Sequence, residues 1–300
     1  MRTGTRLTGW ATLFTGGVAT LVGLFPLREL PPKRQELWLL CATAACALGW
    51  LLASAVARAR RRAALRRRIR RRRHEPWPAR SSYLLSWVLG FGIAFTSAAA
   101  LCQGVGPDGA DGRWLATLRR AHGGTFEIPV RRIVGEPRRA DDGVDDTEAY
   151  LSTVVVTVPF QDGARQVTLD GVRTHGRPEA GRTLQLRYVP DRPELGVRQV
   201  PDNDIGSFAG RIVVLPALWL LAPVVGLLTA LALHRNEAAV RRARRFEPWV
   251  HLPAALLLLC GAALVTPLLL GFPSTATGWA LAAAAATTPW LALAWVARTS

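Results

Sequence analysis

The sequence predicts an α-helical integral membrane protein with six transmembrane helices and one inserted small antiparallel β domain. Apolar stretches of 19 to 23 residues alternate with arginine-rich runs, as in a chain that crosses a bilayer several times. Between residues 103 and 210 the pattern changes to a two-residue alternation, which is typical of strands. The net charge of +17 comes from two short connections and not from the strand-rich region.

Six stretches are long enough to span a hydrocarbon core of about 30 Å as helices. They are Leu7–Phe25, Leu37–Ala57, Ser82–Cys102, Ile212–Leu233, Val250–Phe272 and Thr277–Ala297. None contains Asp, Glu, Lys or Arg in its interior. The first stretch follows a short basic segment but ends without a small-residue cleavage pattern, so we expect a retained helix and not a signal peptide.

These stretches divide the chain into seven parts. They are transmembrane helices 1 and 2 (1–57), an Arg-rich cytoplasmic loop (58–81), transmembrane helix 3 (82–102), an extracytoplasmic β domain (103–210), transmembrane helix 4 (211–233), a basic cytoplasmic loop (234–249) and transmembrane helices 5 and 6 (250–300).

The orientation follows from the distribution of arginine. Residues 57–80 hold twelve Arg and one acid, residues 234–249 hold five Arg and two acids, and residues 103–210 hold 14 Arg and 16 acids. Because arginines in short loops resist translocation, we expect both basic connections and both termini in the cytoplasm. The loop 26–36, with Arg28, Lys33 and Arg34, is then an exception on the outer side.

The location of the charge also bears on partners. The excess lies between apolar stretches, where the positive-inside rule accounts for it, so no nucleic-acid partner is expected. The 37 arginines against one lysine, Lys33, are typical of a GC-rich bacterial genome. We therefore expect the plasma membrane of a bacterium.

The run from Arg58 to Arg73 has two interpretations. Ala, Leu and Arg favour helix, so the run is predicted to continue the second helix and to contact anionic headgroups of the bilayer. The alternative is a loop whose only role is to set the orientation. The predicted lipid-contacting residues are Arg58, Arg60, Arg61, Arg62, Arg66, Arg67, Arg68, Arg70, Arg71, Arg72 and Arg73.

A Glu-Pro-Trp sequence stands before two of the predicted helices, ending at Trp77 and at Trp249. Proline suits the first helical turn, and an amphipathic indole ring favours the headgroup region. Trp77 and Trp249 are therefore predicted interface anchors.

In the region 103–210 five segments alternate as strands do. They are Thr125–Val134, Tyr150–Phe160, Arg165–Val172, Thr183–Val189 and Leu195–Val200. Gln161-Asp162-Gly163 predicts a hairpin turn, and the polar, acidic segment Glu136–Glu148 predicts a long loop. Arg113–Ala121 predicts a short amphipathic helix. Residues 108–205 are expected to fold independently.

Two segments of this region resemble a known family. They are Gly181–Glu194, with the sequence GRTLQLRYVPDRPE, and Val156–Gly163, with the sequence VTVPFQDG. Both are similar to the bacterial family called domain of unknown function 3592, over about 100 of the 300 residues. The resemblance implies a compact extracytoplasmic β domain held between two helices, and it implies no activity. This chain has Val189 where the family usually has an acid after the Tyr.

No motif indicates catalysis, so no catalytic, cofactor-binding or metal-ligating residue is predicted, and the protein is not expected to be an enzyme. His122 and His175 lack the spacing of a metal or nucleophile site, and Asp141–Asp146 lacks the context of a calcium loop. The four cysteines lie in or at the end of apolar stretches, which predicts no disulfide framework.

The sequence therefore favours a non-catalytic cell-envelope protein that binds, senses or scaffolds through its β domain. An envelope protein or a cell-wall component is the expected partner, besides the lipid bilayer. The alternative is a small-molecule transporter or its accessory subunit. The spans themselves argue against transport because they hold no ionisable residue of the kind that lines most ion pathways.

Overall fold

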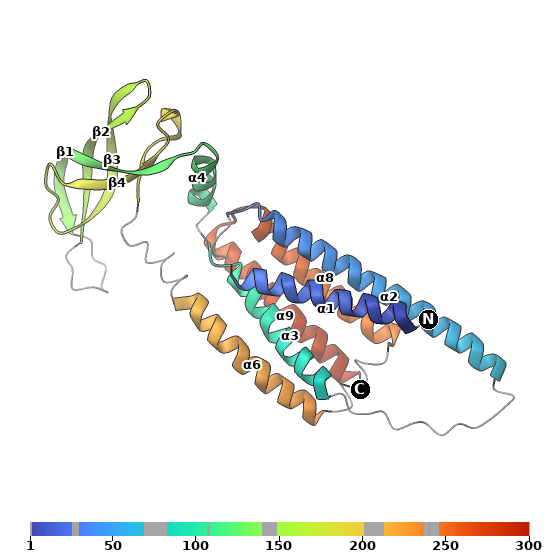
Figure 1. The fold of residues 1–300 in the computed structure, drawn as a ribbon. Helices are drawn as coiled ribbons and strands as arrows, with labels where there is room; N and C mark the ends of the chain where they lie inside the picture. The colour runs from blue at the N-terminus through green and yellow to red at the C-terminus, as the bar shows by residue number, and fades with distance from the viewer. Residues whose placement is uncertain are drawn as a thin grey trace. The chain divides into compact units, whose positions relative to one another are not determined.

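A computed structural model describes the chain except for residues 1, 26–29, 69–82, 107–108, 140–148, 201–212, 237–239, 241–245 and 300. It divides into two compact units (Figure 1). The helical unit comprises Met1–Gly109 and Ala209–Ser300, and the β unit comprises Ala110–Phe208.

The helical unit contains six helices that are long and apolar enough to cross a membrane. They are α1 (Arg2–Leu24), α2 (Arg34–Arg68), α3 (Tyr83–Cys102), α6 (Leu215–Arg235), α8 (Pro248–Leu270) and α9 (Thr275–Arg298). Each contains most of one predicted span, so the six predicted helices are confirmed. The α2 helix continues beyond its apolar part into the arginine run and is described to Arg68.

Large apolar side chains on these helices face outward. Trp10, Phe14, Trp38 and Leu220 are each more than 70% exposed. Soluble proteins rarely expose such continuous apolar surface, because each Å² of it costs about 25 cal/mol in water. The outward-facing side chains are therefore compatible with a multi-pass membrane protein.

Contacts between helix termini define two ends of this unit. At one end, called the Gln103 end, the Lys33 backbone N–H donates to Leu269 at 2.8 Å, and the Trp219 indole donates to the carbonyl of Leu24 at 2.8 Å. At the other, the Arg58 end, the Arg58 guanidinium donates to the carbonyl of Phe246 at 2.7 Å. The chain leaves α3 and enters α6 at the Gln103 end, so both connections to the β unit start there.

The α3 and α6 helices pack closely because glycines replace side chains at their crossing. A Cβ atom at Gly90 would lie 2.5 Å from the backbone nitrogen of Ala230 and 2.7 Å from its Cα. A Cβ atom at Gly226 of α6 would lie 2.7 Å from the Cδ1 atom of the Phe91 ring and 3.2 Å from the Phe91 Cα. Small residues at such a crossing let two backbones approach, which favours packing inside a bilayer.

The β unit begins with the helix α4 and continues as five strands. The elements are α4 (Gly109–Arg120), β1 (Gly124–Arg139), β2 (Ala149–Phe160), β3 (Gly163–His175), β4 (Thr183–Tyr188), the 3₁₀ turn η1 (Pro193–Leu195) and β5 (Arg198–Gln199). The strands form one antiparallel sheet in the order β3-β2-β1-β4-β5, with a core of its own that includes Val154, Val156 and Leu186.

The side chain of Gln199 links the two outer strands of this sheet. It accepts from the Arg173 backbone N–H at 2.9 Å and donates to the Arg173 carbonyl at 2.6 Å. The sheet therefore curves into a half-barrel around its core. Tyr188 packs inside it against Phe126 and Phe160, and burial raises the pKa of its phenol because the charged form is poorly solvated there.

The antiparallel sheet is confirmed, with two corrections. Glu136–Arg139 was predicted as loop but continues β1, because Gly135 adopts a left-handed φ of +77° and Arg138 and Arg139 then pair with β2. Leu195–Val200 was predicted as one strand, but Pro193 begins a 3₁₀ turn and only Arg198–Gln199 pair. The predicted turn at Gln161–Asp162 is confirmed, whereas residues 140–148 of the predicted loop lie outside the described residues.

We expect Gly90→Ala to destabilise the protein by about 1–3 kcal/mol, because the added methyl meets the backbone of α6 and the helices must separate. Gly92→Ala is the matched control on the same helix, since nothing lies within 4 Å of its Cβ position. Thermal unfolding of the purified protein in detergent measures both. Equal melting temperatures for the two variants would contradict the close packing of α3 and α6.

Candidate functional site

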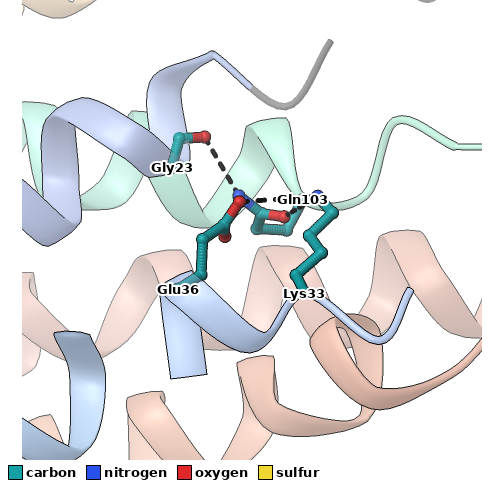
Figure 2. A network of polar contacts seen from close by, with 4 residues as sticks. All are labelled: Gly23, Lys33, Glu36 and Gln103. Atoms are coloured by element: carbon teal, nitrogen blue, oxygen red, sulfur yellow. Dashed lines mark hydrogen bonds and ion pairs between the residues drawn. The ribbon is translucent and has the colours of Figure 1, made fainter. Parts of the chain in front are cut away.

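A buried polar cluster lies at the Gln103 end of the helical unit (Figure 2). The Lys33 ammonium donates to Oε1 of Gln103 at 2.5 Å and lies 3.8 Å from the carboxylate of Glu36. The amide nitrogen of Gln103 donates to the carbonyl of Gly23 at 3.0 Å. One amide group therefore connects the last turn of α1, the residue before α2 and the residue after α3.

The positive charge of Lys33 is compensated within this cluster. A buried ammonium is costly unless a carboxylate and hydrogen-bond acceptors surround it, and here both are present. In the sequence, Lys33 counts among the positive charges of the loop 26–36, and the structure pairs it with Glu36. The spacing of three residues between Lys33 and Glu36 is a signal that the sequence offered, whereas nothing local indicates Gln103.

Seven of the predicted lipid-contacting arginines belong to the described part of α2. Arg58 is half-buried and bonded to Phe246, and Arg60 is exposed. The run continues as helix through the positions of Arg61, Arg62, Arg66, Arg67 and Arg68. The other four arginines of the run, Arg70–Arg73, and the predicted anchor Trp77 lie outside the described residues.

The second predicted anchor, Trp249, is the second residue of α8 and is 56% exposed. Next to it, the rings of Trp50, Phe246 and His251 pack together with centroids 5.4 to 5.9 Å apart. Aromatic and basic groups thus gather at the Arg58 end, whereas the Gln103 end holds a buried, charge-compensated cluster.

A second candidate site is a surface on the β unit, called here the ribbon face. It is formed where the second half of β1 pairs with the first half of β2. The cross-strand pairs here are Arg132–Val155, Val134–Thr153 and Arg138–Leu151. Directly paired residues point to the same side of a sheet, so these six side chains share one face. Val134 and Leu151 are 45% and 42% exposed on this side, whereas Val154 and Ser152 point to the core.

The two histidines of the β unit belong to different parts of its fold. His122 follows α4 with a φ of +58°, and His175 ends β3. Within the described part of the chain, no group of three or more His, Cys, Asp or Glu side chains is placed to hold a metal ion. Cys41, Cys46, Cys102 and Cys260 are free thiols in the helices.

No known protein family, curated protein or solved structure matches this chain. The resemblance of Val156–Gly163 and Gly181–Glu194 to the domain of unknown function 3592 therefore remains a prediction. In the structure these two segments lie close together, since the Gln161 backbone N–H donates to the carbonyl of Pro190 at 3.0 Å.

We expect Gln103→Leu to lower the free energy of unfolding by about 2 kcal/mol, because the Lys33 ammonium and the Gly23 carbonyl each lose a buried partner. Gln35→Leu is the matched control, since Gln35 is exposed between Lys33 and Glu36. Thermal unfolding in detergent, followed by tryptophan fluorescence, measures the difference. Equal melting temperatures for the two variants would show that Gln103 does not hold the three segments together.

We expect a peptide of residues 58–73 to be disordered in buffer and helical on anionic vesicles, with binding lost at high salt. Repulsion among its eleven arginines opposes the helix in water, and each arginine near an anionic surface contributes about 1 kcal/mol before saturation. Circular dichroism and a vesicle co-sedimentation assay measure both effects. Equal binding to neutral vesicles would leave the run with a role in orientation only.

Proposed function

We propose that this chain is a non-catalytic protein of a bacterial cell envelope that binds, senses or scaffolds another envelope component through its β unit. The observation that carries the proposal is the construction of the β unit. It has its own buried core, and its two connections to the helical unit start from the same end. A folded unit inserted in this way is held at a membrane surface and remains free to present its side chains.

The proposed orientation places the Arg58 end in the cytoplasm and the β unit outside. In support, the contact of Arg58 with Phe246 joins the two arginine-rich connections at one end of the helical unit. Arginines resist translocation, so this end is retained inside. Gly9 of α1 approaches Trp50, so the N-terminus belongs to this side. The α8 helix begins beside Phe246 and α9 returns after a short connection, so the C-terminus belongs to this side as well. Membership of the domain of unknown function 3592 family is part of the same proposal.

Transport, by the chain itself or as an accessory subunit, is the second candidate. The observation in its favour is the buried cluster of Lys33, Glu36 and Gln103, since polar groups buried among membrane helices often bind solutes. The cluster lies at helix termini, and its hydrogen bonds join chain segments to one another. The binding proposal is therefore favoured.

The orientation predicts opposite labelling of two single cysteines, Arg68→Cys and Asp146→Cys, in a variant without the native cysteines. A membrane-impermeant maleimide should label position 146 in intact spheroplasts and position 68 only after the membrane is opened. Mass spectrometry of the protein measures the labelling. The reverse pattern would overturn the proposed orientation.

The binding function predicts that photocrosslinks form from the β unit. A photoreactive residue at exposed positions of the β unit, in native membranes, should capture a defined envelope component. The same residue at Leu220, which is 74% exposed on α6, is the control and should capture lipid only. Gel electrophoresis and mass spectrometry identify the products. Absence of any product from the whole surface of the β unit would refute the proposed function.

A further inference from the structure

The ribbon face of the β unit carries an unusual combination of exposed apolar and basic side chains. Of the large apolar side chains that are exposed in the described residues, only Phe126, Val134 and Leu151 belong to the β unit. Phe126 packs its ring on Tyr188, with centroids 4.6 Å apart, at the rim of the core. Val134 and Leu151 lie instead on the ribbon face, in diagonal positions on two paired strands.

Arginines surround these two apolar side chains. Arg132 and Arg138 of β1 are exposed on the same face. On the other neighbouring strand, β3, Arg173 pairs with Leu151 and therefore belongs to this face as well. Two acids accompany these three arginines, since Asp170 accepts a hydrogen bond from Thr153 at 3.0 Å and the exposed Glu136 lies between Val134 and Arg138 on β1. The ribbon face therefore combines an apolar centre with a net positive border, the composition of a binding surface for an acidic partner.

We propose that the ribbon face binds an acidic protein segment that also carries aliphatic side chains. This inference rests on the proposed function and names the partner class of the β unit. Carboxylates of the segment pair with Arg132 and Arg138, while its aliphatic groups cover Val134 and Leu151. A purely hydrophilic polyanion fits less well, because it leaves the two apolar side chains in water.

Two other occupants fit less well. A second copy of the chain would bring its own ribbon face, and the arginines of the two copies would repel each other. Because β4 pairs with β1 only from Gly124 to Pro129, the second half of β1 has an edge without a neighbouring strand in the described sheet. Addition of a strand to that edge is opposed by the backbone. The two register shifts of β1, the left-handed Gly135 and Pro137, which has no N–H, all interrupt a regular edge. The segment therefore binds through side chains on the face.

The test uses the full chain in nanodiscs of neutral lipid and three fluorescent twelve-residue peptides. The first contains Glu and Leu, the second Gln and Leu, and the third Glu and Ser. We expect the Glu-Leu peptide to bind most tightly and its affinity to fall with salt. Fluorescence anisotropy measures each dissociation constant, and inorganic polyphosphate is titrated as a fourth probe.

Three double variants locate the binding. Arg132→Glu with Arg138→Glu should weaken binding of the Glu-Leu peptide about tenfold or more, because attraction becomes repulsion. Val134→Ser with Leu151→Ser should weaken it about threefold or more while leaving the Glu-Ser peptide unaffected. Arg119→Glu with Arg120→Glu, on the exposed side of α4, is the matched charge control and should change binding less than about twofold.

Each contrary result overturns the inference. Equal losses in the two arginine variants indicate an attraction to net charge, which the run Arg58–Arg73 also supplies. Polyphosphate binding as tight as that of the Glu-Leu peptide, and unaffected by Val134→Ser with Leu151→Ser, indicates an anionic polymer. Either result leaves the proposed function intact, since that function fails only when no position of the β unit forms a photocrosslink.

Discussion

The side-chain amide of Gln103 forms the interaction on which the arrangement of the helix ends depends. Its oxygen accepts from Lys33 and its nitrogen donates to the carbonyl of Gly23, so both halves of the amide are used in a buried place. An unpaired buried amide or ammonium costs several times more than a made hydrogen bond contributes. The two bonds therefore hold α1, α2 and α3 together at the point where the chain leaves for the β unit.

The two ends of the helical unit differ in whether acids accompany their positively charged side chains. At the Gln103 end, Lys33 is buried beside Glu36 and contributes little net charge. At the Arg58 end, the arginines follow one another along α2 without acids between them. The positive-inside rule depends on uncompensated charge in the connections. The pairing of Lys33 with Glu36 therefore reduces the conflict between this loop and the proposed orientation.

The sequence predicted those elements that a local pattern determines and missed those that depend on distant contacts. A span of about 20 apolar residues or a two-residue alternation is visible within one segment, so six helices and the main strands were predictable. The continuation of β1 past Gly135 was not, since Gly135 and Pro137 indicate a turn until the pairing with β2 is known. Gln103 and Lys33 are 70 positions apart, and no local pattern relates them.

Exposed apolar side chains are costly in water on both units. They favour different partners because their surroundings differ. On the helices, exposed Leu, Trp and Phe side chains are continuous, and lipid tails are the medium that removes their cost. On the ribbon face, Val134 and Leu151 form a small patch with arginines around it. Lipid tails would leave those arginines without water or counterions, at a cost larger than the gain from two aliphatic side chains. An acidic segment with aliphatic side chains satisfies both groups at once, which is why we propose a protein partner for the ribbon face.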